Sequence, residues 1–162
     1  MRRYAEDTSV PVAKSRAEID KLLRDWGCAQ LQWSDDFKRG RAQLRFVWEH
    51  EGHSYLARFD VPLPDAEALK KHAIDGRNGL VSERKLQALM DARGKHEHRV
   101  LLIWLKGALN AVEAGIVSPE VVFLAHLEGS DGVTVAERAI PRLAMLTQGS
   151  ADRLLADGGD DG

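Results

Sequence analysis

The sequence is poor in cysteine and has no long apolar run, and these shortages exclude several kinds of protein. Cys28 is the single cysteine, so an internal disulfide and a cysteine-based zinc cluster are both excluded. The apolar run at residues 100–105 is far shorter than the roughly 20 residues that span a bilayer. No N-terminal segment pairs a basic start with an apolar run, as a secretory signal does. We therefore expect a cytoplasmic protein without membrane contact.

Motifs for catalysis and metal binding are also missing. Neither His-Glu-x-x-His nor Gly-x-Ser-x-Gly occurs, and the glycines within residues 76–79 lack the flanking pattern of a phosphate-binding loop. The pairs His50/His53 and His96/His98 could in principle supply four zinc ligands, but neither pair has the i, i+4 helical spacing. We expect solvated histidines, no cofactor and no enzymatic activity, with a metal-dependent enzyme as the alternative.

The 162 residues are enough for one domain with a real core. A helix is predicted over residues 15–26, because Ser15 and Glu18 form a capping box and four apolar residues follow on one helical face. These are Ile19, Leu22, Leu23 and Trp26. Gly27 ends this helix. Residues 1–14 are expected to form an extended arm, since Pro11 discourages a helix there.

Beyond Gly27 the apolar period changes from 3.6 to 2, which predicts strands. Three alternating stretches follow, separated by turns at residues 34–40 and 51–52. Their order predicts an antiparallel meander with one aromatic, buried face and one exposed face. Residues 65–82 are expected to form a mobile surface loop, with a possible short helix over residues 66–73.

A long helix is predicted from residue 82 to residue 114, with Ser82 as its cap, Gly94 as a kink or break and Gly115 as its end. Its second half is apolar on nearly all sides, so it is buried in its own core or against another chain. We predict a homo-oligomer formed through this half. The residues proposed for self-association are Leu101, Trp104 and Leu105. Packing against the apolar segment 121–124 is the alternative.

The C-terminal part carries two more helix starts and an acidic end. Ser118 and Pro119 predict a helix to about residue 127, and Thr134 with Glu137 repeats the capping-box pattern. Residues 149–162 are rich in glycine and aspartate, which predicts a disordered acidic tail. The predicted fold is therefore α+β, with one domain over residues 15–148: a three-stranded antiparallel meander packed on an N-terminal and a long helix, followed by a small C-terminal helical segment.

A basic cluster on the meander gives a prediction of function. Its members are Lys38, Arg39, Arg41, Arg45 and Arg58. By strand alternation the arginines of the second strand point away from the buried face. Arginine forks bind phosphates through paired hydrogen bonds, and a flat sheet could track a single strand of nucleic acid. We predict that this face binds DNA, possibly single-stranded; the alternative is a solvated face balanced by acidic neighbours such as Glu49 and Asp60.

Four segments carry a resemblance to a known group of proteins: residues 4–19, 105–116, 123–127 and 131–135. The chain resembles small, uncharacterised proteins encoded in bacteriophages and prophages, a family without an assigned activity, so no site residue is transferred from it. The order helix, meander, long helix is also similar to the core of phage single-strand annealing proteins. The resemblance implies a phage or prophage accessory protein. The alternative to DNA binding is an interaction module, such as an inhibitor of a host defence protein, that uses the acidic tail or the loop 65–82.

Overall fold

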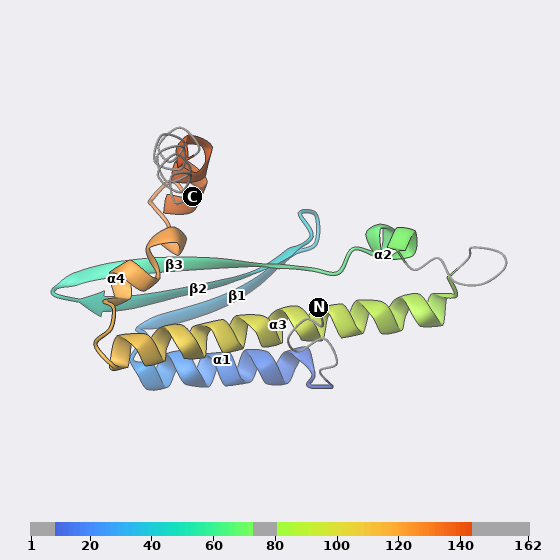
Figure 1. Cartoon of the computed structure of the whole chain (residues 1–162), viewed down its shortest axis with the longest axis horizontal. Helices are drawn as coiled ribbons and strands as arrows, with labels where there is room; N and C mark the ends of the chain where they lie inside the picture. Colours follow the sequence, from blue (N-terminus) through green and yellow to red (C-terminus); the bar gives the residue numbers. More distant parts are fainter. Residues whose placement is uncertain (1–8, 73–80, 144–162) are drawn as a thin grey trace, which may run out of the picture.

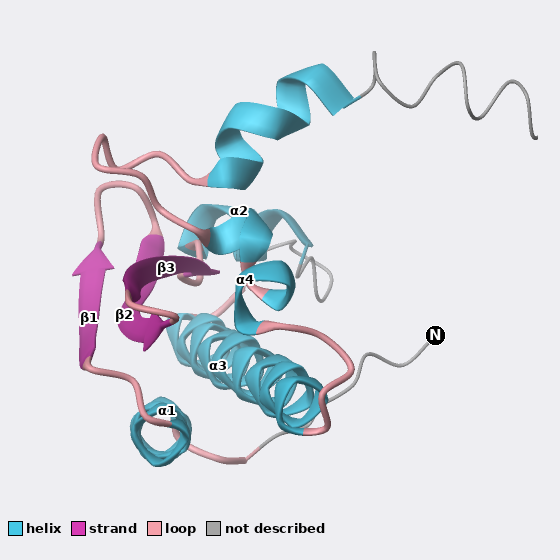
Figure 2. Cartoon of the chain, turned by 90° about the vertical axis from the view of Figure 1, so that its left-hand side faces the viewer, coloured by secondary structure: helices cyan, strands magenta, loops and turns pink. Residues whose placement is uncertain are grey.

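The computed structural model of the chain, which describes residues 9–72 and 81–143, has the predicted α+β architecture (Figures 1 and 2). Helices α1 and α3 lie side by side and cover one face of a three-stranded antiparallel sheet of order β1-β2-β3. The elements in chain order are α1 (Val12–Trp26), β1 (Gln30–Asp36), β2 (Arg41–His50), β3 (His53–Pro62), α2 (Ala66–His72), α3 (Glu83–Glu113), α4 (Pro119–Val122) and the 3-10 turn η1 (Leu124–His126). Residues 135–143 form a further helical segment.

The start of α1 differs from the prediction. The helix begins at Val12, so residues 12–14 do not belong to an extended arm. The Pro11 carbonyl accepts hydrogen bonds from the backbone N–H groups of Lys14 and Ser15, both at 3.1 Å. Ser15 is fully buried inside the helix, and the predicted capping box is wrong because a proline can precede the first turn at no cost in hydrogen bonds. The end at Gly27 is confirmed by its φ of 103°.

The sheet follows the predicted alternation. Leu44 lies opposite Trp33 on one side and Phe59 on the other, and all three side chains face the helices. The β2–β3 hairpin is closed by a two-residue turn in which Glu51 has φ 49° and Gly52 has φ 77°. Two positive φ values match the right-handed twist of paired strands, which is why such turns close hairpins.

The core is centred on Phe123, which joins α4 to η1. Its side chain is fully buried and its ring centroid lies between 5.4 and 6.2 Å from those of five other aromatic residues. These residues are Trp26, Phe46, Trp48, Phe59 and Trp104. Phe123 therefore ties the chain that follows α3 to the sheet and to both long helices. The predicted helix 119–127 is in fact one α-helical turn and one 3-10 turn.

Helix α3 runs for 31 residues without a break at Gly94, so the predicted kink is wrong. Gly94 lies where the helix meets other elements: a Cβ there would come 3.6 Å from Val12 Cγ2 and 3.7 Å from Pro64 Cγ. The cap is as predicted, with Ser82 Oγ accepting a hydrogen bond from the Lys85 N–H at 3.3 Å. The first half of α3 extends beyond the sheet, where α2 lies near it (Figure 1).

The remaining predictions of organisation are met in part. Thr134 and Glu137 form the predicted capping box, since each accepts a hydrogen bond from the backbone N–H of the other. The arm at residues 1–8, the section 73–80 of the surface loop, the domain end 144–148 and the acidic tail 149–162 lie outside the described residues. A search of the described helices finds none with the length and apolar character needed to cross a membrane.

Candidate functional site

The face of the sheet opposite the helices carries Arg41, Arg45 and Arg58, as predicted, but it is not open. Arg58 is 5% exposed and Gln43 is 8% exposed, and Arg45 and Arg58 are direct cross-strand partners. The chain after η1 covers this face, beginning with the Glu128 N–H, which donates to the Leu56 carbonyl at 2.9 Å. The predicted exposure of Arg58 is wrong because this later segment, far away in sequence, packs over it.

Carboxylates neutralise the arginines of this face. The Arg58 guanidinium donates to Glu137 Oε1 and to the Gly132 carbonyl, each at 2.5 Å, and lies 3.5 Å from Glu128 Oε2. Arg45 Nε donates to the same Glu128 oxygen at 3.1 Å. Burial lowers the pKa of Arg58, but Asp60, Glu137 and Glu128 outweigh it and raise the pKa above its ordinary value. These arginines hold the segment 128–138 on the sheet.

Arg41 is the third arginine of the face and also has an acidic partner. Its Nη1 lies 3.3 Å from Asp60 Oδ2, and Gln43 Nε2 donates to the other Asp60 oxygen at 2.8 Å. A phosphate at this face would have to compete with carboxylates already in place. The sequence contained the acids but gave no sign that Glu128 and Glu137 would reach the sheet.

Lys38 and Arg39 lie elsewhere, on the turn between β1 and β2, and both are exposed. Arg39 contacts Asp36 loosely, with 3.7 Å between Nη1 and Oδ2. Phe37, beside them, is 82% exposed, and this residue was missed by the sequence reasoning, which treated it as part of a turn. An apolar ring in the middle of a polar turn was the signal available. We call Phe37, Lys38 and Arg39 the hairpin tip.

One side of α3 presents an apolar surface, which we call the Trp104 face. It consists of Val61, Val100, Leu101, Trp104 and His126, which line a hollow of about 260 Å³ that Asp60 and Glu97 also line. Trp104 is 41% exposed and Val100 is 39% exposed. Of the residues predicted for self-association, Trp104 lies on this face and Leu101 is partly buried against the core.

Leu105 is fully buried between α3 and the sheet. Its assignment to self-association is therefore wrong, because its position on the helix turns it into the protein's own core. His126 closes the Trp104 face: its ring stacks on Phe59 at 4.0 Å between centroids and meets Trp104 at 5.5 Å. Burial lowers the pKa of His126, against the opposing effects of a hydrogen bond with the Arg58 backbone and of nearby Asp60.

A polar cluster that the sequence did not reveal joins α1, β1 and α3. Arg16 Nε donates to His98 Nε2 at 3.1 Å, and Arg16 Nη2 donates to Asp35 Oδ1 at 2.7 Å. The same guanidinium lies 4.6 Å from the centroid of the Trp33 ring. His98 Nδ1 lies 2.9 Å from the Gly94 carbonyl. With both ring nitrogens engaged in this way, His98 is held as the neutral form that donates through Nδ1.

His98 is 2% exposed, so the expectation that it is solvated is wrong. Burial lowers its pKa most, and the Arg16 charge adds to this effect, whereas the Gly94 hydrogen bond and the charges of Asp35 and Glu97 oppose it. His50 and His53 are cross-strand partners at the β2–β3 hairpin, and His50 Nδ1 lies 2.7 Å from Glu120 Oε1. Within residues 9–72 and 81–143 no three His, Cys, Asp or Glu side chains converge as metal ligands would.

Replacing Arg58 tests whether the covered face is a structural contact. Arg58→Met should lower the free energy of unfolding by about 2 kcal/mol, because it removes the buried guanidinium that donates to Glu137 and to the Gly132 carbonyl. The matched control is Arg138→Met, which removes a pair with Asp131 whose side chains are 55% and 52% exposed and should cost at most about 1 kcal/mol. Urea denaturation followed by tryptophan fluorescence measures both, and equal losses would contradict the structural role.

Buried His98 and His126 predict a dependence of stability on pH. Both have pKa values below the ordinary 6.5, so as the pH falls below about 6.5 the unfolded chain binds protons before the folded chain does. Stability should then decrease by up to about 1.4 kcal/mol per pH unit for each histidine.

The variants His98→Gln and His126→Gln should each reduce this slope, which urea denaturation at several pH values measures. The lowered pKa values of Asp35 and Glu137 act in a separate, more acidic range, below their ordinary 3.8 and 4.5. A slope between about pH 6.5 and pH 5 that persists in the double variant would contradict the assignment to these two rings.

Comparisons of the chain with protein-family models, with curated proteins and with solved structures found no match.

Proposed function

We propose that this chain is a non-enzymatic phage or prophage accessory protein that acts in the cytoplasm as a protein-interaction module and binds a second copy of itself through the Trp104 face. The observation that carries the proposal is the 41% exposure of Trp104 beside Val100, which is 39% exposed. Tryptophan is enriched at the centres of protein interfaces. Contiguous exposed apolar side chains on a protein surface mark interaction sites.

The neighbourhood of the Trp104 face supports an apolar partner. Trp104 is packed against Phe123 at 6.0 Å between ring centroids, so its ring is already fixed and loses little freedom on binding. The hollow and the half-exposed Trp104 and Val100 side chains beside it give one surface both a recess and projections. A two-fold dimer needs such a self-complementary surface.

The charges of the molecule favour the Trp104 face over the sheet face as the binding surface. The arginines at positions 41, 45 and 58 each have a carboxylate partner, so the sheet face offers little charge to a phosphate backbone. A net charge of −2 gives two copies of the chain little mutual repulsion.

Trp104→Glu should weaken self-association, because it places a charge at the centre of the proposed interface. The wild-type mass should rise with concentration from one copy towards two, and the variant should weaken the dimer by about 2 kcal/mol or more, or roughly thirtyfold. Light scattering coupled to size-exclusion chromatography measures the mass, and circular dichroism checks the fold.

Ile116→Glu is the control, because Ile116 is 79% exposed but lies beyond the end of α3. It should dimerise like the wild type. A wild-type protein that stays monomeric at the highest accessible concentration would contradict the proposal of self-association. Immobilised wild type and Trp104→Glu would then be compared for capture of a host protein.

A second candidate function is nucleic-acid binding, and the hairpin tip is the observation that favours it. We propose that Lys38 and Arg39 contact phosphates while Phe37 stacks on a base of a single strand. An exposed aromatic ring beside two cations is the combination that single-strand binding uses. The tip thus takes the place of the sheet face in the DNA-binding hypothesis.

The double variant Lys38→Ser/Arg39→Ser should reduce the salt dependence of binding to a labelled single-stranded oligonucleotide, with the log–log slope changing by about 1.4 for two lost phosphate contacts. Phe37→Ala should weaken binding by about 1–3 kcal/mol. The charge-matched control is Lys21→Ser/Lys70→Ser on α1 and α2. Fluorescence anisotropy measures all four proteins, and an equal effect of the control double variant would show that only net charge matters.

A further inference from the structure

A hollow of about 390 Å³ lies beside the hairpin tip, and we call it the tip hollow. It reaches from Phe37 to Gln87 and Met90 in the first half of α3, and the start of α1 and the chain that follows β3 complete its walls. Its size is within the range of about 300–1,000 Å³ that is usual for small-molecule sites. The tip hollow is therefore large enough for one planar ring system.

Apolar side chains form most of the wall of the tip hollow. They are Pro11, Val12, Leu63, Pro64 and Met90. Phe37 adds an aromatic ring that is 82% exposed, so this ring is accessible to a ligand. Apolar and aromatic side chains of this kind favour contact with the flat faces of a planar ring.

The charged side chains that line the tip hollow balance one another. They are Arg16 and Lys95 on one side and Asp35 and Asp91 on the other. A ligand with a net charge would meet a like charge for every opposite charge, whereas an uncharged ring with polar atoms on its edge meets no such opposition. The lining therefore favours an uncharged ring with a polar edge.

Arg16 and Asp35 can hydrogen-bond to the edge of such a ring. Their side chains are 23% and 34% exposed, although they already pair with each other. A guanidinium has five N–H groups, and three of those on Arg16 donate to Asp35 and His98. Each carboxylate oxygen of Asp35 accepts one of these bonds and has a second lone pair. The pair therefore offers further donors and acceptors to a ligand.

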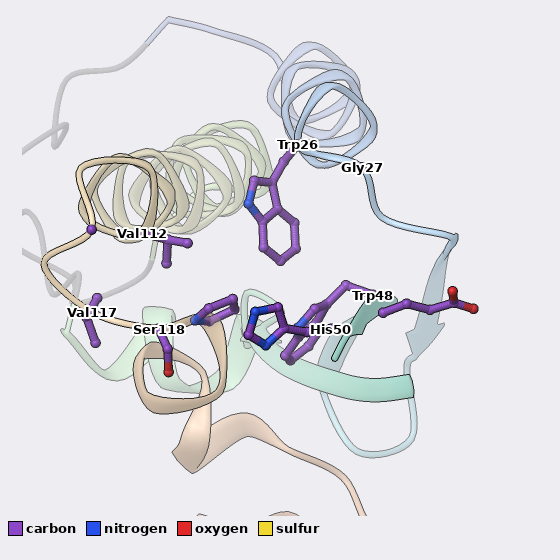
Figure 3. Close-up of a pocket in the computed structure, with 10 residues that line it drawn as sticks. Trp26, Gly27, Trp48, His50, Val112, Val117 and Ser118 are labelled. Atoms are coloured by element: carbon purple, nitrogen blue, oxygen red, sulfur yellow. The ribbon is translucent and has the colours of Figure 1, made fainter. Parts of the chain in front are cut away.

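The tip hollow also lies next to two exposed cations. Lys38 and Arg39 follow Phe37 directly in the chain and are exposed. A second hollow, of about 520 Å³, lies among the ends of α1, β2 and α3 and the start of α4 (Figure 3). It is at the opposite end of β2 from the hairpin tip, and among the described residues no lysine or arginine lines it. Of these two hollows, only the tip hollow combines apolar walls with cations that can hold a phosphate.

We propose that the tip hollow takes one base of a single-stranded nucleic acid whose phosphates lie on Lys38 and Arg39. The proposal rests on nucleic-acid binding by the hairpin tip and extends it from a surface contact to a pocket. Phe37 stacks on the base, and Arg16 and Asp35 hydrogen-bond to its edge. Every base has a flat face and a polar edge, so the pocket accepts a base without selecting the sequence.

Filling the tip hollow tests the proposal. Gln87 is exposed and lines the hollow, so Gln87→Trp should fill it and leave the hairpin tip unchanged. The affinity for a labelled thymidine octamer, measured by fluorescence anisotropy at low salt, should fall about tenfold, as expected for the loss of one stacked base. Ala88→Trp is the control, because it adds the same ring at an exposed neighbouring position outside the lining. It should bind the octamer like the wild type.

The same octamer without its bases separates the pocket from the phosphate contacts. It keeps the phosphates that Lys38 and Arg39 bind, so the wild type, Gln87→Trp and Ala88→Trp should bind it equally. Thymidine monophosphate, added as a competitor, distinguishes a free nucleotide from a strand and should bind at least about tenfold more weakly than the octamer, since it lacks the other phosphates. If circular dichroism shows that Gln87→Trp does not fold, Met90→Trp fills the hollow from the next turn.

Three results would overturn the proposal. Equal affinities of the folded Gln87→Trp and Ala88→Trp variants for the thymidine octamer would remove the pocket, while a reduced salt dependence in Lys38→Ser/Arg39→Ser would still support binding by the hairpin tip. No binding of the octamer by the wild type at low salt would remove both. Equal affinities of the wild type for the monophosphate and the octamer would assign the hollow to a free nucleotide instead of a strand.

Discussion

The fold depends on the burial of Phe123 among five aromatic rings. These rings come from four elements, α1, β2, β3 and α3. A side chain of this size accounts for about 3–5 kcal/mol when fully buried, a large part of the stability of a small domain. Because Phe123 lies between α4 and η1, this contact fixes where the chain returns to the sheet after α3.

The sheet is covered on both faces, but by different kinds of contact. Apolar side chains seal it against α1 and α3, whereas ion pairs hold the segment 128–138 over the other face. This second contact buries Arg58 and pairs Arg45 with Glu128, which leaves the hairpin tip and the Trp104 face as the exposed features. The surfaces with functional potential are therefore at the margins of the sheet and not on it.

The elements were predictable from the sequence because each has its own periodicity. The meander, the end of α1 at Gly27 and the Ser82 cap follow from local patterns. The errors on site residues concern side chains whose environment is set by distant segments: Leu105 in the core, Arg58 beneath Glu137, and His98 against Arg16. Local spacing says which way a side chain points, and it says nothing about what arrives from 80 residues away.

The Glu137 side chain makes two contacts at once, and these couple the helical segment 135–143 to the sheet. One carboxylate oxygen accepts from the Thr134 N–H at the start of the helical segment 135–143, while the other accepts from Arg58 on the sheet. When the segment separates from the sheet, Glu137 loses Arg58 and the first turn of that helix becomes less stable. When the first turn frays, the contact between Glu137 and Arg58 is weakened in the same way. The two events form a single cooperative unit in local unfolding. The amides of residues 128–140 should then exchange with solvent as a group, at a rate separate from that of the aromatic core.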